Sequence, residues 1–342
     1  MNAPKPRFPA IDAHTHIELD GAEVAIDTMD AVGLDAMVNL TAGTVLDFQE
    51  GQKVFGGKHA DRFAWCVKLD FENLDDPAWG KTQADGLEAA VKAGASALKE
   101  VKRLGLGARW ESGELLKIDD PVLDPVWERC AKLGVPMFIH TSDPLAFHQP
   151  LSQTNERLTE LQAHPDWVFQ KPGLPSKYEL LEARNRVIER HPKMKFICVH
   201  VANFPEDPVT VALWLEKYPN MYIDTSARFV EMGRHHPEMM HNFFVRFQDR
   251  ILFGTDTGIS SEHIMLGVRM PSDEEFFKRE DFKEQFLYPY FSSMYRYLET
   301  DDYYIPSSTP IQGNWPLHGI ALPDDVLKKI YIENARRILP GL

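Results

Sequence analysis

The chain has 342 residues, of which 44% are hydrophobic and 26% are charged. This composition is typical of a globular protein with a sizeable core, and the length allows one large barrel domain or two ordinary domains. The formal net charge of −14 argues against nucleic acid and anionic membranes as partners, because both favour a basic face. An anionic small molecule stays compatible with this charge, since a site can be locally positive within an acidic surface.

The cysteines and the start of the chain predict a cytoplasmic protein. Cys66, Cys130 and Cys198 are widely spaced, without any CxxC pattern, and each lies in an apolar or amphipathic stretch, so they are expected to be reduced core residues. Residues 1–9 are proline-rich and lack the apolar run of a signal peptide. No segment approaches the roughly 18 continuous apolar residues of a membrane span.

Apolar runs of strand length alternate with amphipathic stretches of helix length along the chain. The predicted strands are Phe8–Ile17, Ala36–Thr41, Phe63–Leu69, Ala95–Val101, Pro136–Thr141, Lys195–Val201, Met221–Thr225 and Ile251–Thr255. The predicted helices are Val24–Val32, a stretch ending near His59, Leu87–Ala93, Pro125–Leu133, Glu179–Arg190, Pro208–Tyr218, Pro237–Gln248 and Asp324–Leu339.

The strands are almost continuously apolar, as expected of parallel strands buried on both faces. Eight strand–helix units within one domain, residues 1–342, predict an α/β fold, a (β/α)8 TIM-type barrel. An open doubly wound sheet is the alternative, but no GxGxxG pattern follows the first strand.

Two insertions interrupt the repeat, Asp143–Ser176 after the fifth strand and Gly258–Pro323 after the eighth. Loops that follow strands lie on the catalytic face of such a barrel, so both could cover a site. The second insertion is dense in phenylalanine and tyrosine. Those aromatic residues could equally fill a satellite core or an interface in a homo-oligomer, and the two interpretations are compatible.

Metal-capable residues occur at the carboxyl ends of four predicted strands. In the first strand, alternation places Asp12, His14 and His16 on one face and turns Ile11 and Ala13 towards the helix layer. Two histidines so spaced can bind one divalent ion, although HxH alone is a weak motif.

Three further residues of this kind end apolar strands: His140 the fifth, His200 the sixth and Asp256 the eighth. Each alone could be a satisfied buried polar group or a helix cap. Four strands of one barrel that all end in metal-capable residues, at the end where catalytic groups gather, instead favour a metal site.

The pattern resembles the amidohydrolase superfamily, and in particular its family 2 branch, which also contains non-oxidative decarboxylases. The supporting stretches are His140–Pro144, Phe253–Asp256 and Glu333–Arg337. The resemblance implies that His14, His16, His140 and Asp256 bind a divalent metal, usually zinc, with manganese also compatible. It implies that His200 completes a second metal site or acts beside a single metal, and that Asp256 takes a proton from metal-activated water. Asp256 and His200 are thus the implied catalytic residues.

Lys99 lies near the end of the fourth strand, where some branches of the superfamily carry a carboxylated lysine between two metals. Strand alternation puts Lys99 and Val101 on one face and Glu100 and Lys102 on the other. If Lys99 faces the lumen, it could bridge metals or bind a substrate carboxylate. If it does not, it reaches solvent past the barrel rim.

Arg228 and His148 are the remaining candidates for substrate binding. Arg228 follows the seventh strand, and a guanidinium on the catalytic face suits bidentate recognition of a carboxylate. A salt bridge to Glu231 is the alternative. His148 lies in the first insertion, shortly after His140.

These residues predict a metal-dependent hydrolase that uses activated water to open a lactone, amide or ester bond of a small, acidic substrate. The first alternative is a metal-dependent, non-oxidative decarboxylase of a small or aromatic carboxylic acid. The second is a metal-binding scaffold without activity.

Overall fold

The computed structural model describes residues 3–268 and 273–342. Ten strands of this part of the chain form one sheet, in the order β10-β9-β1-β2-β3-β4-β5-β6-β7-β8. The bounds are β1 (Ala10–Ile17), β2 (Leu34–Asn39), β3 (Phe63–Lys68), β4 (Ala97–Val101), β5 (Met137–His140), β6 (Phe196–Cys198), β7 (Met221–Asp224), β8 (Ile251–Leu252), β9 (Thr257–Ile259) and β10 (Ile264–Met265).

The sheet closes on itself because the eighth strand of the barrel is made of two pieces. Its first piece, β8, pairs in parallel with β7, and its second, β9, pairs in parallel with β1. Between them, the amide of Ala13 donates to the carbonyl of Phe253, and the amide of Asp256 donates to the carbonyl of His14, each at 2.9 Å. The predicted (β/α)8 barrel is confirmed.

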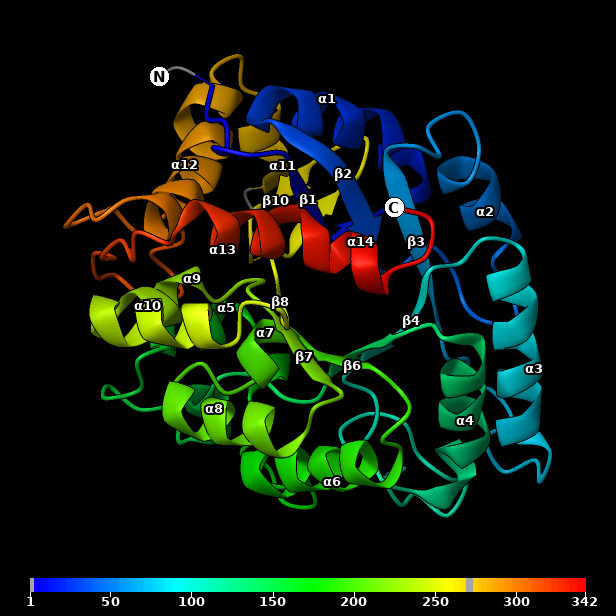
Figure 1. The fold of residues 1–342 in the computed structure, drawn as a ribbon. Helices are drawn as coiled ribbons and strands as arrows, with labels where there is room; N and C mark the ends of the chain where they lie inside the picture. The colour runs from blue at the N-terminus through cyan, green and yellow to red at the C-terminus, as the bar shows by residue number, and fades with distance from the viewer. Residues whose placement is uncertain (1–2, 269–272) are drawn as a thin grey trace.

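Helices surround the strands (Figure 1). They are α1 (Ala22–Val32), α2 (Gln49–Phe55), α3 (Trp79–Lys92), α4 (Asp124–Leu133), α5 (Leu158–Ala163), α6 (Lys177–Arg190), α7 (Val199–Ala202), α8 (Pro208–Lys217), α9 (Phe229–Gly233), α10 (Pro237–Arg246), α11 (Asp273–Phe277), α12 (Tyr288–Glu299), α13 (Asp324–Lys328) and α14 (Asn334–Ile338). Within the described ranges, every helix is too short or too polar to span a membrane.

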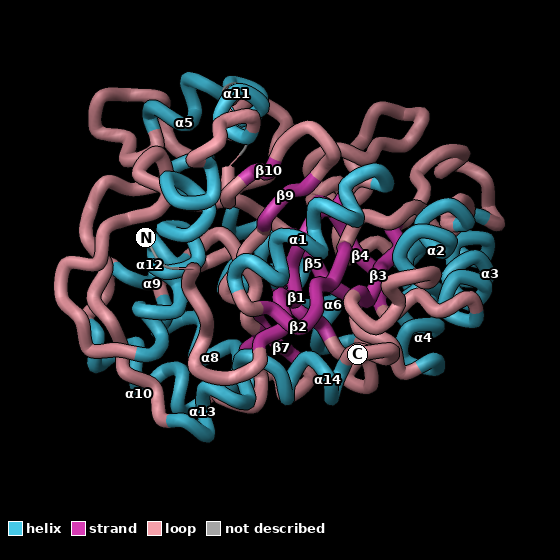
Figure 2. Tube along the Cα trace, turned by 90° about the horizontal axis from the view of Figure 1, so that it is seen from above, coloured by secondary structure: helices cyan, strands magenta, loops and turns pink. Residues whose placement is uncertain are grey.

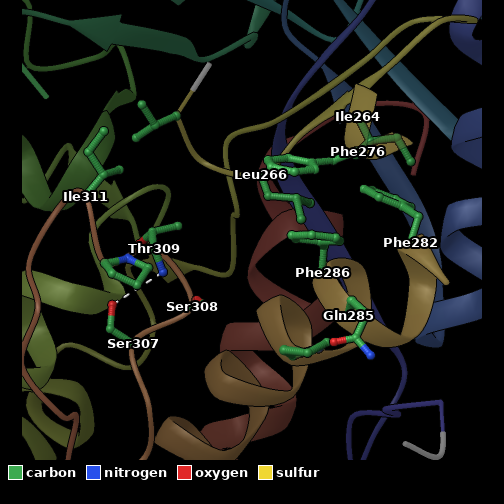
Figure 3. A pocket seen from close by; sticks show the side chains of 13 residues that line it. Ile264, Leu266, Phe276, Phe282, Gln285, Phe286, Ser307, Ser308, Thr309 and Ile311 are labelled. Carbon is green, nitrogen blue, oxygen red and sulfur yellow. Dashed lines mark hydrogen bonds between the residues drawn. The ribbon is translucent and has the colours of Figure 1, made fainter. Parts of the chain in front are cut away.

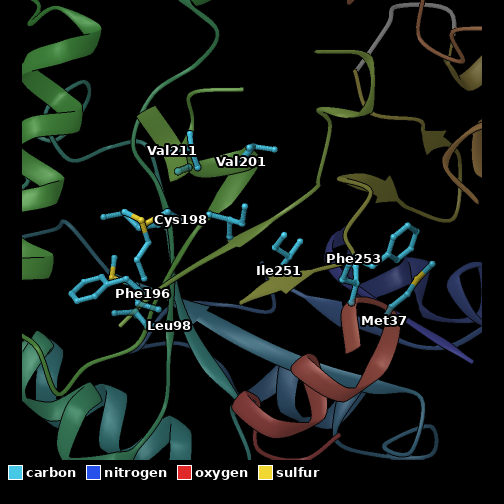
Figure 4. Packing of buried hydrophobic residues seen from close by; sticks show 14 of the residues in the cluster. Met37, Leu98, Phe196, Cys198, Val201, Val211, Ile251 and Phe253 are labelled. Carbon is cyan, nitrogen blue, oxygen red and sulfur yellow. The ribbon is translucent and has the colours of Figure 1, made fainter. Parts of the chain in front are cut away.

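Two hydrophobic clusters fill the two layers of the barrel. The larger lies between strands and helices and includes Phe196, Ile251 and Phe253 (Figure 4). The smaller packs inside the barrel around Phe138, and residues of the closing helix α14 join it. Figure 2 shows α14 at one end of the strands and α5 and α11, from the two insertions, at the other. The lumen is therefore plugged at one end, and a site can form only at the other.

The face assignment predicted for the first strand is wrong for Ile11, Ala13 and Asp12. Ile11 and Ala13 pack inside the barrel, whereas Asp12 points outwards and accepts hydrogen bonds from the amide and hydroxyl of Thr255. The cause is a register shift against β2 between Asp12 and Thr15, which adds a residue to β1. His14 still reaches the lumen because this bulge restores its orientation.

Candidate active site

The predicted metal-binding residues meet at the carboxyl end of the barrel. Oδ1 of Asp256 lies 3.3 Å from Nε2 of His14 and 3.3 Å from Nε2 of His16. Nε2 of His200 lies 3.3 Å from Nδ1 of His140, and the rings of His14 and His200 are 4.9 Å apart. His14, His200 and Asp256 each offer a ligand atom within 4.8 Å of the others. The strand ends thus bring together all five residues that the sequence predicted.

The hydrogen bonds of His14 leave one ring nitrogen free for a cation. Its Nδ1 lies 2.7 Å from Oδ2 of the buried Asp224, which can only accept while it is ionised. The proton therefore sits on Nδ1, and Nε2 presents a lone pair. Nε2 is buried, has no hydrogen-bond partner among the described residues, and faces the carboxylate of Asp256. Two acceptors that face each other at this distance fit a divalent cation, and the Asp224–His14 pair is the usual support of a metal ligand.

His200 is oriented by a turn that the sequence did not predict. The predicted strand Lys195–Val201 ends at Cys198, and each residue from His200 to Asn203 has φ between 54° and 57°. The amide of His200 donates to Oδ1 of Asp224 at 2.8 Å, and Nδ1 lies 2.9 Å from the carbonyl oxygen of Ser226. Nδ1 is therefore the donor, and Nε2 turns towards His140.

Burial keeps these imidazoles neutral, which is the form that binds a metal. Burial lowers the pKa of His14 and His200 well below the ordinary value, and lowers that of His140 to about 4. Burial works against ionisation of Asp256, but the neighbouring His14 and His16 outweigh it and lower the pKa of the carboxyl group. The site thus combines neutral nitrogen donors with an ionised carboxylate.

Lys99 faces the site and does not reach solvent. Its side chain is fully buried and lines the site cavity, and Nζ has no hydrogen-bond partner among the described residues. Burial lowers the pKa of Lys99 to about 8. Lys102 also lines this cavity, although alternation places it on the opposite face. A φ of 54° turns it inwards, and its Nζ lies 2.6 Å from Asp143 Oδ2.

The cavity has a volume of about 330 Å³, which suits a small molecule. It is lined by His16, Lys99, Val101, Lys102, His140, Asp143, Phe147, Glu160, Trp167, His200, Ala227, Arg228, Asp256, Met265, Gly267, Val268 and Gln312. Arg228 is almost fully buried, its Nε has no hydrogen-bond partner in the described ranges, and Glu231 Oε1 is 3.8 Å away. The salt bridge to Glu231, which was the alternative to substrate binding, is therefore present but long.

His148 does not line this cavity. Its Nε2 lies 2.9 Å from the hydroxyl of Ser142, and its ring packs 5.3 Å from that of Phe169 in a neighbouring hollow. The sequence reasoning also missed Asp224, which supports both His14 and His200. The signal that could have found Asp224 is the one used for the ligands, a polar residue at the end of an apolar strand.

The second insertion both covers the site and forms a pocket of its own. Strand β10 separates the two spaces: Met265 lines the site cavity, while Ile264 and Leu266 line an apolar pocket of about 360 Å³ (Figure 3). Alternation along an extended segment explains the division. Phe276, Phe282 and Phe286 complete the pocket, so both interpretations of the aromatic insertion hold in part.

The comparisons with known proteins agree with this geometry. The family model described as Amidohydrolase matches residues 11–341, and the chain therefore belongs to the amidohydrolase family, in the family 2 branch that also contains non-oxidative decarboxylases. Hydrolases and decarboxylases alike make up this enzyme family. No curated protein matches the chain.

Two solved structures illustrate the shared fold. The chain is similar to 2,6-dihydroxybenzoate decarboxylase from Rhizobium, with 17% identity over 99% of this chain and 98% of that chain and a TM-score of 0.52. It is also similar to 5-carboxyvanillate decarboxylase from Sphingomonas paucimobilis, with 14% identity over 96% of this chain and 98% of that chain and a TM-score of 0.50. At this identity the likeness establishes the fold alone.

Proposed function

We propose that this protein is a metal-dependent hydrolase that opens a lactone, amide or ester bond in a small, acidic substrate. The observation that carries the proposal is the place of Asp256. Its carboxylate lies beside Nε2 of His14 and His16 and lines the same cavity as Lys99 and Arg228. A base and two cations thus face one small space.

Under this proposal His14, His16, His140 and Asp256 hold one divalent cation, zinc or manganese, with His200 beside it. When bound, the cation supplies Lewis acidity, which polarises a substrate oxygen and makes water a stronger acid. Nε2 of His14 supports this assignment, because it is buried without a hydrogen-bond partner among the described residues, and such a nitrogen is costly.

Side chains of the protein carry out the proton transfer and bind the substrate. Asp256 accepts the proton of the attacking water and returns it to the leaving oxygen or nitrogen as the acyl bond breaks. His200 also lines the cavity and is the second group that could hold a proton during the reaction. Lys99 and Arg228 bind the acidic group of the substrate, since each is a buried cation with one nitrogen that has no hydrogen-bond partner in the described part of the chain. His148, predicted from the sequence as a substrate contact, instead lies outside the cavity and contacts Ser142.

A second candidate function is non-oxidative decarboxylation of a small or aromatic carboxylic acid. Lys99 Nζ and Arg228 Nε favour it, because they have no hydrogen-bond partner among the described residues and this reaction needs a carboxylate held in place. The aromatic side chains of Phe147 and Trp167 in the cavity suit a planar substrate. Two structures with this fold are decarboxylases of aromatic acids. Here a C–C bond breaks, carbon dioxide leaves, and the ring carbon takes a proton from Asp256 or His200.

One experiment separates the two reactions. Metal-loaded protein is screened against lactones, amides, esters and aromatic acids, and the active substrate is then turned over in ¹⁸O-enriched water. Hydrolysis puts the heavy oxygen into the product acid. Carbon dioxide release, with solvent deuterium on the product carbon and no added oxygen, would refute hydrolysis in favour of the second candidate. Asp256→Asn is the matched control for background reaction, and no turnover of any substrate would favour an inactive scaffold.

A further inference from the structure

A buried network of charges connects the first insertion to the wall of the cavity. Arg157, which precedes α5, donates through NH1 to Glu160 at 2.6 Å and through NH2 to Glu231 in α9. Arg157, Glu160 and Glu231 are each at most 2% exposed. Arg228 is next to Glu231 and lines the cavity together with Glu160. Two arginines and two glutamates therefore share one space beside the site.

An outer ion pair fixes the register of this contact. Glu156 precedes Arg157 in the insertion, and Arg234 lies three residues after Glu231, where a helix presents both to one side. Arg234 NH1 lies 2.8 Å from Glu156 Oε2. Each segment carries an acid followed by a base, Glu156 then Arg157 and Glu231 then Arg234, and the two ion pairs cross-match them. A shift by one residue would bring like charges together.

The inner part of the network is unsaturated. Nε of Arg157, Nε of Arg228 and Oε2 of Glu231 are buried and have no hydrogen-bond partner among the described residues. Arg228 Nε and Glu231 Oε1 are 3.8 Å apart, beyond hydrogen-bond distance. The same Oε1 instead accepts from Arg157, whose other nitrogen is held by Glu160. Arg157 therefore keeps Glu231 away from its neighbour in the cavity wall.

We propose that Arg157 is a positioning residue, which occupies Glu231 and so leaves Nε of Arg228 available to a carboxylate of the substrate, while Nη1 of Arg228 donates to the carbonyl of Ala227 at 2.7 Å. The inference rests on the role proposed above for Arg228. If Arg157 is removed, Arg228 is the one remaining cation paired with Glu231 among the described residues. A buried carboxylate without a partner is costly, so Glu231 would turn and pair with Arg228. The cavity would then lose one of its anion-binding groups.

The test measures how accessible the guanidinium of Arg228 is, and it needs neither substrate nor turnover. Metal-loaded, full-length protein is treated with phenylglyoxal, which modifies free guanidinium groups, and the rate at Arg228 is followed by peptide mass spectrometry. Arg157→Met is expected to slow this modification about tenfold, in the range of coupling within one ion-pair network. Arg157→Lys should keep most of the wild-type rate, and Glu231→Gln alone should raise it.

Rescue separates positioning from mere support of the fold. The double variant R157M/E231Q removes one cation and one anion, and it should modify Arg228 at the wild-type rate or faster. A structural role alone would leave the double variant as slow as R157M or slower. In a crystal structure of R157M, Glu231 should lie within about 3 Å of Arg228 Nε, the usual hydrogen-bond distance.

Arg234→Met is the matched control, because it breaks the outer pair and leaves Glu231 untouched. It should change the rate at Arg228 less than twofold, about the noise expected between independent sites. Equal rates in R157M and wild type, or a double variant that stays slow, would overturn the inference. If R157M does not fold, the double variant and E231Q decide. Should Arg228→Lys leave binding of an identified substrate unchanged, the proposed role of Arg228 fails while the modification result stands separately.

Discussion

Replacement of Asp224 by Asn exchanges one carboxylate oxygen for an amide group at the centre of the site. Oδ1 of Asp224 accepts from the amide of His200, and from the amide and hydroxyl of Ser226, while Oδ2 accepts from Nδ1 of His14. The amide oxygen of Asn can keep the first three bonds. Its NH2 group must then face His14 and donate, so the proton of His14 moves from Nδ1 to Nε2. That nitrogen no longer offers a lone pair to a metal.

The magnitude follows from the bond that is lost. A hydrogen bond to a charged group contributes about 1.5–3 kcal/mol, and loss of such a partner behind a metal ligand weakens metal affinity roughly 10- to 100-fold. That range corresponds to about 1.4–2.7 kcal/mol. We therefore expect Asp224→Asn to bind zinc about 10- to 100-fold more weakly than wild type, because the carboxylate that orients His14 is lost. Titration against a chelating indicator measures this directly.

Asp12→Asn is the matched control for this experiment. Asp12 is also fully buried in the same region, but it accepts from the amide of His14 and from Thr255, and from no imidazole in the part of the chain that the structure describes. Its replacement should lower the free energy of unfolding in urea by about 1–3 kcal/mol and leave the metal affinity close to wild type. If both variants weaken zinc binding equally, or if Asp224→Asn binds zinc normally, the tautomer argument is refuted.

Four further predictions concern the metal and Lys99. His14→Ala or Asp256→Ala should remove most bound metal and activity while the protein stays folded, and full metal content in a double variant at His14 and His16 would contradict the assignment. Elemental analysis should find one metal per chain if Lys99 is unmodified, whereas two metals bridged by carboxylated Lys99 would contradict this. Because burial lowers the pKa of Lys99 to about 8, its ammonium is lost as the pH rises through that value, so anion affinity should fall above pH 8 in wild type but not in Lys99→Met. The same shift destabilises the folded state below its pKa, so the contribution of Lys99 to stability should rise between pH 8 and the usual 10.5, which urea unfolding of both proteins can check.

Most strands of the barrel could be predicted because parallel strands buried on both faces are continuously apolar. The exceptions are local. The predicted sixth strand extends to Val201, but the observed strand ends at Cys198. The chain there enters a left-handed turn, and the turn contains no glycine that would have predicted it from the sequence. The bulge in β1 leaves no mark in the sequence either, since Ile11 and Asp12 fit either face of an alternating strand.

The candidate metal-binding residues could be predicted because a barrel gathers its strand ends, so their positions at strand ends placed them together. The residues that support them were not predicted, although Asp224 ends an apolar strand and could have been found in the same way. Arg157 and Glu231 lie far apart in the sequence, and an arginine in a loop gives no sign that it is buried. Lys102 was assigned to the wrong face because alternation fails where φ is positive. What sequence periodicity cannot supply is the geometry of the turns.

Those turns share one physical feature: non-glycine residues in the left-handed conformation, at positions that line or support the site. Left-handed, non-glycine residues follow β4, β6, β7 and β8, at Lys102, His200–Asn203, Ala227 and Asp256. Each costs on the order of 1 kcal/mol, and glycine would avoid that cost. A residue in the left-handed conformation changes the direction of the chain sharply. Its side chain, or that of the next residue, can then point towards the open end of the barrel. At His200 and Asp256 the residue that turns is also a proposed catalytic residue, and at Lys102 it lines the cavity. Glycine cannot replace it there, and the strain persists because the buried hydrogen bonds around Asp224 and Asp143 hold these turns in place.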